Sequence, residues 1–174
     1  MFILKLNGVK HKKLVANGLP HVNISRFGQA EFGENLLLRT GVANSEVGLV
    51  GTRIVVRGHG RLKIGKNVGM TNTSIFVDDS ITIGDNVMIG GGTQIFDTNF
   101  HSTDADNRIA GKNASTDVKT SPIHIGDKVF IGTNCLICKG VTIGDNAVIA
   151  AGSVVVKNVG ANEMHGGNPA KKLK

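Results

Sequence analysis

Aliphatic residues recur at every sixth position over two stretches of the chain. The earlier stretch contains Ile83, Ile89 and Ile95, and the later one contains Ile125, Ile131, Ile137, Ile143, Ile149 and Val155. A step of six is neither the helical period of 3.6 nor simply the strand period of two. Because a hexapeptide repeat is typical of a parallel β-helix, the pattern predicts an all-β fold of this kind.

Each hexad has an aliphatic residue, a small residue, two polar residues, and then a small or aliphatic residue before a variable one. The copies occupy 64–69, 83–88, 125–130 and 143–148, with a degraded copy at 32–37. Three hexads make a triangular coil of 18 residues, so Ile125 and Ile143 are expected to stack in neighbouring coils. Stacked coils lie about 4.8 Å apart, the ordinary spacing between strands.

The interruptions of the repeat predict the organisation of the chain. One residue is inserted between Ile64 and Ile83, near Phe76, and a long polar segment separates the two isoleucine stretches. We expect a single domain over 1–174. Its predicted parts are irregular coils over 1–60, a regular β-helix over 61–157 and a tail over 158–174. The polar segment becomes a protruding loop over 101–124, and loops of this length inside a compact domain are usually functional or disordered.

Composition agrees with a narrow prism and points to an anionic partner. Aromatic residues make up only 4%, with no Trp or Tyr, and the 24 glycines suit sharp corners. The net charge of +7 favours nucleic acid, a phosphorylated cofactor, an acidic sugar or a membrane surface. We expect no nucleic acid, because no aromatic residues interleave with the basic ones. No segment reaches the roughly 20 apolar residues of a membrane span, so a cytoplasmic protein is expected.

The two cysteines do not predict a metal or redox site. Cys135 and Cys138 form a lone C-x-x-C, without a second ligand pair or a thioredoxin-like context. We therefore expect unlinked, reduced thiols and no metal ligands.

His101 is the candidate catalytic residue. It ends the segment 95–101, where the regular coil stops and the long loop begins. A rigid scaffold lies on one side of it, and an imidazole is the natural general base near neutral pH. Asp97 is a candidate to orient the imidazole, although a turn-forming role explains it equally well.

Together, the hexapeptide ladder, the Asp-Thr-Asn-Phe-His junction at 97–101 and the Gly-Asn-Pro-Ala-Lys tail at 167–171 resemble the hexapeptide-repeat acyltransferases. The most similar branch is the sugar O-acetyltransferases, including galactoside, maltose and surface-polysaccharide acetyltransferases. The resemblance extends from about residue 60 to 174. It implies a left-handed parallel β-helix, a homotrimer with active sites between subunits, and acetyl-CoA as the co-substrate, with no metal.

The resemblance also implies roles for single residues. His101 matches the family's base, which would deprotonate a sugar hydroxyl as that oxygen attacks the thioester. Acceptor-binding positions match Asn72 and either Asp78 or Asp79, and Asp97 is added from its place near His101. The implied coenzyme A contacts are Thr133, Ala151, Val156, Lys157, Lys171 and Lys174. Val156 departs from the Thr common in the family, which removes one side-chain hydrogen bond to the cofactor.

Three other functions are compatible with such a scaffold. An N-acyltransferase acting on a nucleotide amino sugar would use the same His and the same cofactor groove. A zinc enzyme like the γ-class carbonic anhydrases needs three His ligands, and only His101 is well placed. A non-enzymatic scaffold predicts an unbroken repeat without the long loop or the cationic tail.

Overall fold

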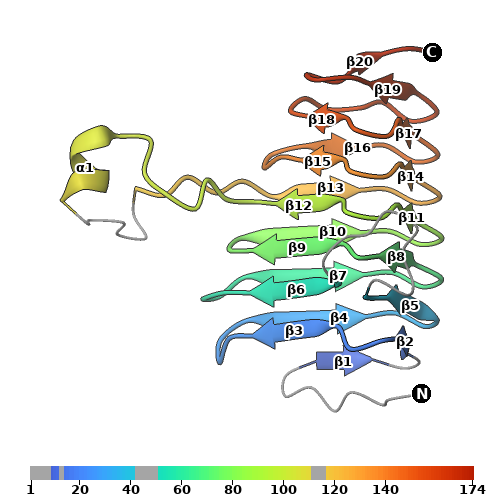
Figure 1. Ribbon diagram of the computed structural model, residues 1–174, viewed down its shortest axis with the longest axis horizontal. Coiled ribbons are helices and arrows are strands. Elements are labelled where there is room, and N and C mark those ends of the chain that lie inside the picture. The colour runs from blue at the N-terminus through green and yellow to red at the C-terminus, as the bar shows by residue number, and fades with distance from the viewer. Residues whose placement is uncertain (1–8, 12–13, 42–50, 111–116) are drawn as a thin grey trace.

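The chain forms a left-handed parallel β-helix whose coils stack into a three-faced prism (Figure 1). The computed structural model describes residues 9–11, 14–41, 51–110 and 117–174. Each coil places one strand on each face, and neighbouring coils pair in parallel. The fold class predicted from the six-residue period is confirmed.

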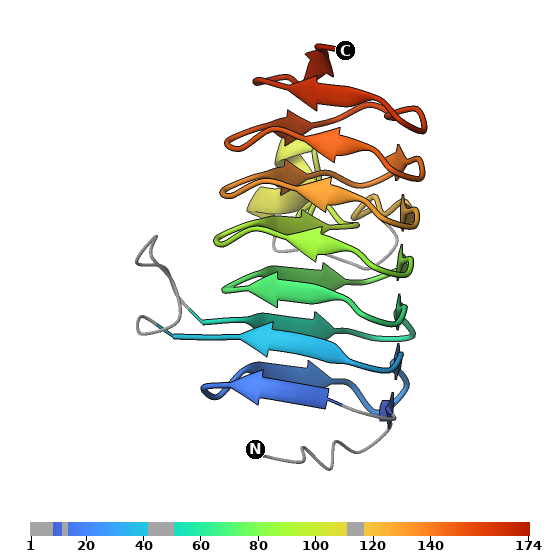
Figure 2. The ribbon, with the colours of Figure 1, turned by 90° about the vertical axis from the view of Figure 1, so that its right-hand side faces the viewer.

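The strands are distributed over the faces as follows. The first face contains β1 (Val9–His11), β4 (Gln29–Phe32), β7 (Arg61–Ile64), β10 (Ser80–Ile83), β13 (Ile123–Ile125) and β16 (Thr142–Ile143). The second face, turned toward the viewer in Figure 2, contains β2 (Leu14–Asn17), β5 (Leu36–Arg39), β8 (Gly69–Thr71), β11 (Met88–Ile89), β14 (Phe130–Ile131), β17 (Val148–Ile149), β19 (Met164–Gly166) and β20 (Lys171–Lys172). The third face contains β3 (His21–Ile24), β6 (Arg53–Val56), β9 (Ser74–Val77), β12 (Gln94–Phe96), β15 (Leu136–Ile137) and β18 (Val154–Val155).

The isoleucine ladder fills the interior of the prism. Ile125 pairs with Ile143, as the 18-residue coil predicted, and Ile83 pairs with Ile125 across the long loop. All three are about 1% exposed. Burying an aliphatic side chain of this size contributes roughly 1.5–3 kcal/mol, so the stack is a large part of the stability of the fold.

Polar ladders tie the coils together where the first face turns into the second. The Asp85 amide donates to the Asp127 carboxylate at 2.8 Å, and the Asp127 amide donates to Asp145 at 2.8 Å. Asn67 and Asn86 have positive φ values of 55° and 59°, and their side chains bond to each other at 3.0 Å. Asparagine tolerates this left-handed conformation better than most residues, which explains its presence at this position in the copies at 64–69, 83–88 and 143–148.

The first sixty residues differ from the irregular coils that we expected. Strands β1 to β6 lie there and extend the same three faces, with Phe32 paired to Ile64 and Ile54 paired to Ile75. Strand β4 keeps the two-residue alternation of exposed and buried positions, whereas β6 buries its last three residues. The six-residue spacing is lost because the connections vary in length, and one of them includes 42–50, outside the described residues.

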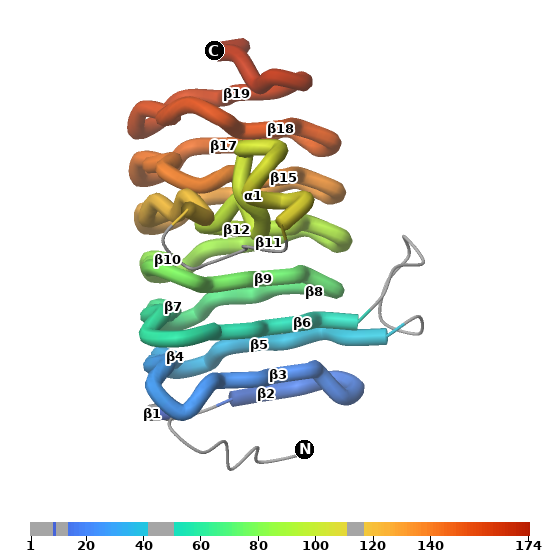
Figure 3. Tube along the Cα trace, turned by 90° about the vertical axis from the view of Figure 1, so that its left-hand side faces the viewer, coloured from blue at the N-terminus to red at the C-terminus, as the bar shows by residue number. Residues whose placement is uncertain are grey.

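The predicted loop leaves the prism at the corner between the third and first faces, which we call the loop corner (Figure 3). It contains one short helix, α1 (Ala105–Ile109), which buries none of its residues and is capped by the Asp104 side chain. Thr98 pairs with Thr120, and the Ser121 amide donates to the Asp97 carbonyl at 2.9 Å, so the two arms of the loop meet at its base. Residues 111–116 lie outside the described part of the chain.

The predicted tail folds back onto the end of the prism. Strand β19 pairs with β17 in parallel, and β20 pairs with β19 in the antiparallel direction. The Glu163 carboxylate holds this end together, because it accepts bonds from Lys172 Nζ at 2.7 Å and the Gly160 amide at 2.9 Å and lies 2.9 Å from His165 Nε2. Lys172, followed by His165 and Gly160, lowers the pKa of Glu163 to about 2.

This depressed pKa predicts a pH-dependent contribution to stability. A carboxyl whose pKa is lower in the folded state stabilises the fold above its unfolded pKa of about 4.3, and loses that effect as the pH falls toward 2. We expect Glu163→Gln to lower the melting temperature slightly at pH 7, because the group is open to solvent. The difference from the parent protein should shrink between pH 4 and pH 3. Glu31→Gln, an exposed change on β4, is the matched control, and a difference that is constant with pH would contradict the role of Glu163.

Candidate functional site

His101 is exposed and lies at the base of the long loop, just after β12. Its amide donates to the Asn99 carbonyl at 2.7 Å, and the Phe100 amide donates to Thr98 Oγ1 at 3.1 Å. Phe100 has a φ of 61°, which is rare for a bulky residue. Such strain persists only where the surroundings hold it, and it is concentrated at functional sites.

An aromatic cluster fixes this strained turn. The Phe100 ring packs edge-on against Phe76 and Phe96, with ring centroids 4.8 Å and 5.2 Å away. Phe76 and Phe96 are paired neighbours on β9 and β12. Because edge-to-face pairs are worth about 0.5–1.5 kcal/mol each beyond burial, the cluster anchors the residue next to His101 on the rigid third face.

A hollow of about 630 Å³ lies beside His101. Its lining residues are Arg57, Gly58, His59, Asp78, Phe100, His101, Val118 and Thr120. These come from two successive turns of the loop corner and from both arms of the loop, so the hollow combines the scaffold with the loop. It contains two imidazoles, a carboxylate and a guanidinium group.

Arg57 and Asp78 form a two-pronged ion pair in this hollow. Arg57 Nε and Nη2 donate to the two carboxylate oxygens of Asp78 at 2.7 Å and 2.5 Å. The guanidinium also lies 4.7 Å from the centroid of the Phe76 ring. The hydrogen bonds to Asp78 raise the pKa of Arg57 above its usual value, although partial burial opposes this. The pair therefore fixes the direction of the Asp78 carboxylate, one of the two alternatives for the acceptor-binding acid.

Asp97 is part of the scaffold rather than an open acceptor-binding group. Its side chain is 0% exposed, and its two oxygens accept bonds from the amides of Asp78 at 2.8 Å and Asp79 at 2.9 Å. Burial raises its pKa, while these two bonds act in the opposite direction. The structure corrects the prediction that Asp97 binds the acceptor or orients His101. Asp97 instead caps a turn of the neighbouring coil, the one that presents Asp78.

Asn72 does not join His101 and Asp78 within one chain. It is 2% exposed and lies at the corner between the second and third faces, which we call the glycine corner. Its side-chain oxygen accepts a bond from the Gly41 amide at 2.9 Å. Because this corner and the loop corner are at opposite ends of the third face, Asn72 can meet His101 only if a second copy supplies one of them.

The predicted coenzyme A contacts also divide between the two corners. Thr133 and Ala151 lie at the glycine corner, where a Cβ on Gly132 would be only 2.6 Å from the Ala151 amide. Val156 and Lys157 are exposed at the loop corner. Lys171 and Lys174 are exposed at the end of the prism. No single edge of the chain brings all six together.

The comparisons with known proteins agree with the fold. Residues 122–157 match the family model described as the hexapeptide repeat of succinyl-transferase. This segment is therefore a hexapeptide repeat, and the resemblance of the chain to the hexapeptide-repeat acyltransferases is confirmed. It is 37% identical over 114 residues to galactoside O-acetyltransferase of Escherichia coli, a match that covers 65% of this chain and 53% of that protein.

Two solved structures resemble almost the whole length of this chain. A hexapeptide-repeat-containing acetyltransferase from Vibrio cholerae, solved with acetyl coenzyme A, is 29% identical with a TM-score of 0.57, over 96% of this chain and 70% of that one. An N-acyltransferase from Bacillus cereus, solved with dTDP and 3-hydroxybutyryl-CoA, is 17% identical with a TM-score of 0.71, over 95% and 81%, and shows the shared fold alone. The chain spans about half the length of the curated relatives it matches.

A metal-binding cluster and a membrane-spanning helix are both absent from the described residues. No group of three or more His, Cys, Asp or Glu side chains is placed there to hold a metal ion. Within residues 9–11, 14–41, 51–110 and 117–174, no helix is long and apolar enough to cross a membrane.

The sequence interpretation missed Arg57, His59 and the packing role of Phe100. Arg57 and His59 lie in the stretch that was treated as irregular, so their place one turn below Asp78 was hidden. A usable signal in the sequence was the pair of glycines Gly58 and Gly60, because glycines mark turns. The structure has this turn, and the Gly60 amide donates to the Arg57 carbonyl at 2.8 Å. This turn precedes Asp78 by about one coil and marks the same corner.

Asp97→Asn tests the capping role. An asparagine side chain has one carbonyl oxygen, so one of the two amides of the Asp78 turn would lose its acceptor and face an NH₂ group. We expect a loss of about 1–3 kcal/mol in the free energy of unfolding, measured by urea denaturation. Asp106→Asn, an exposed change of the same kind in α1, should cost less than about 0.5 kcal/mol. Equal effects of the two changes would contradict the assignment.

Proposed function

We propose that the chain is an acetyl-CoA-dependent acetyltransferase that acts on a sugar hydroxyl, with His101 as the general base. The observation that supports this most is the exposed His101, fixed by the Phe100 cluster at the edge of a polar hollow. The E. coli relative is a galactoside O-acetyltransferase, and the V. cholerae structure contains acetyl coenzyme A. A role in polysaccharide biosynthesis belongs to the same proposal.

The chemistry requires one proton acceptor near the acceptor hydroxyl. His101 takes the hydroxyl proton as the oxygen attacks the thioester carbonyl, and an oxyanion forms. When this intermediate collapses, the C–S bond breaks and the imidazolium returns the proton to the leaving thiolate. Asp78, held by Arg57, lies in the same hollow and is suited to accept a hydrogen bond from a neighbouring sugar hydroxyl.

We also propose that the working site lies between copies of the chain, in a homotrimer. The division of the cofactor contacts between two corners supports this, because a groove between adjacent prisms would bring a loop corner beside a glycine corner. Thr133, Ala151, Val156 and Lys157 would then contact coenzyme A together. Lys171 and Lys174 would supply cations for its phosphates.

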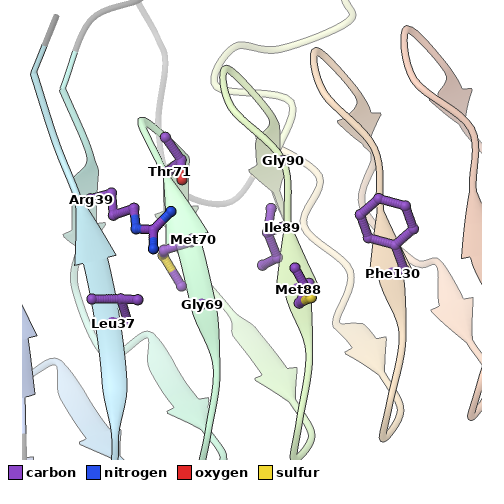
Figure 4. Close-up of a pocket in the computed structure, with 9 residues that line it drawn as sticks. All are labelled: Leu37, Arg39, Gly69, Met70, Thr71, Met88, Ile89, Gly90 and Phe130. Carbon is purple, nitrogen blue, oxygen red and sulfur yellow. The ribbon is translucent and has the colours of Figure 1, made fainter. Parts of the chain in front are cut away.

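The second face offers a surface suited to such contacts. Its outward positions form an apolar row that runs across the paired strands, and Figure 4 shows three of its members, Leu37, Met88 and Phe130. Met88 is 63% exposed and Phe130 is 47% exposed. The full row is Val15, Leu37, Gly69, Met88, Phe130, Val148 and Met164. A contiguous apolar strip of this length is unusual on a monomer and favours an interface.

His101→Ala tests the catalytic assignment. Loss of a general base typically lowers turnover by about 10²–10⁴-fold, and we expect this loss in release of free thiol from acetyl-CoA with sugar acceptors. Coenzyme A affinity should be unchanged, because the imidazole acts on the acceptor. His124→Ala on β13 is the matched control and should retain activity. Full activity of the His101 variant would refute the base, and transfer to amino sugars alone would favour the N-acyltransferase alternative.

Phe130→Asp tests the oligomer. A charge in the apolar row should convert a trimer into monomers at micromolar concentration, because a buried unpaired carboxylate is costly. Light scattering after size exclusion measures the mass directly. Thr142→Asp, an exposed change on β16 of the first face, should leave the mass unchanged. A parent protein that is already monomeric, or a Phe130 variant that remains trimeric, would count against this interface.

A further inference from the structure

The hollow beside His101 continues down the loop corner as a column of rings and cationic groups. His59 lines the hollow, and its ring stacks on Phe27 at 5.1 Å between centroids and 19° between planes. The Arg26 guanidinium also lies over the Phe27 ring, 5.6 Å from its centroid. Arg57, over Phe76, occupies the turn that also contains His59. These side chains therefore form one row along the loop corner, from Arg26 to His101.

The turns that carry this column are built alike and bonded together. In both of them the fourth residue donates its amide to the first carbonyl, from Gly28 to Ser25 at 3.1 Å and from Gly60 to Arg57 at 2.8 Å. Ser25 Oγ also donates to the Gly58 carbonyl at 2.6 Å. The side chains of Arg26, Phe27 and His59 are therefore presented by fixed backbone, although all three are exposed.

The distribution of aromatic residues strengthens the case that this corner binds something. The chain has seven Phe and no Trp or Tyr. Phe27, Phe76, Phe96 and Phe100 all belong to this corner or to the adjoining edge of the third face. Phe27 is 59% exposed although it stacks on His59, so it contributes little to the core. An exposed aromatic face beside a guanidinium group is suited to a flat, partly apolar ligand that also carries negative charge.

We infer that this column, from Arg26 and Phe27 through His59 and Arg57, binds an extended acidic oligosaccharide and leads its reacting hydroxyl to His101. The inference rests on the proposed function, because it names the acceptor class for the same site. Phe27 and His101 are three coils apart, a distance on the order of 14 Å, so the ligand must be longer than one sugar ring. The aromatic rings would stack on sugar faces.

The charge of the column favours an acidic rather than a neutral saccharide. Arg57 is paired with Asp78, but Arg26 has a ring contact and no ion pair among the residues that the structure describes. A carboxylate on the sugar would pair with Arg26, and His59 would add a second donor. Binding should therefore weaken as the salt concentration rises.

Direct binding tests the column without acetyl-CoA. We would measure calorimetric affinity for a hexamer of galacturonic acid, a hyaluronan hexasaccharide, and the carboxyl-reduced galacturonate hexamer. The acidic hexasaccharides should bind the parent protein more tightly than the reduced one and than monomeric galacturonic acid. Phe27→Ala and Arg26→Gln should each weaken this binding by about tenfold. Leu19→Ala and Arg53→Gln, exposed changes near the glycine corner and away from the column, are the controls.

The outcomes separate this inference from the proposed function. Acidic hexasaccharides that do not bind, or that bind equally well to the Phe27 and Arg26 variants, would overturn the column, even if His101-dependent thiol release is found. A change of oligomeric mass in these variants would also overturn it, because the column would then be an interface. Loss of binding in the variants, together with an active His101→Ala protein, would refute the catalytic proposal and leave the column in place.

Discussion

The stacking of each residue on its counterpart in the next coil determines most of this structure. Parallel pairing at about 4.8 Å forces like residues into contact, so isoleucine must pack on isoleucine inside and carboxylates must find amides at the corners. Both edges of each interior strand are occupied by its neighbours. Additional chain can therefore leave only at a corner, and the long loop does so between β12 and β13.

The same constraint explains how a site can be built on so uniform a scaffold. At the loop corner the repeat is replaced by particular side chains: Asp97 caps the turn that presents Asp78, and Arg57 binds that carboxylate from the turn below. Phe100 holds the strained backbone before His101 against two paired phenylalanines. Each of these groups contacts a neighbour one coil away, so the stacking of the coils also positions the side chains of the polar hollow.

The sequence predicted those features that depend on the period and failed where the period is absent. The register of Ile125 and Ile143 and the place of the long loop followed from spacing alone. Coils were expected in the N-terminal part, but their individual strands were not predicted. Connections of unequal length remove the six-residue step there. Asp97 was misassigned for a different reason. Its proximity to His101 along the chain was visible, whereas its bonds to the Asp78 turn depend on stacking between coils.

The antiparallel strand β20 has a consequence for how such a prism can vary in length. Its reversed direction gives the C-terminal end a different edge from the one that each parallel coil offers to the next. Whole coils are therefore more easily gained or lost at the β1 edge, on the N-terminal side of the turns that carry Arg26, Arg57 and His101. In evolution, the span of the molecule and its reactive centre could then change independently of each other.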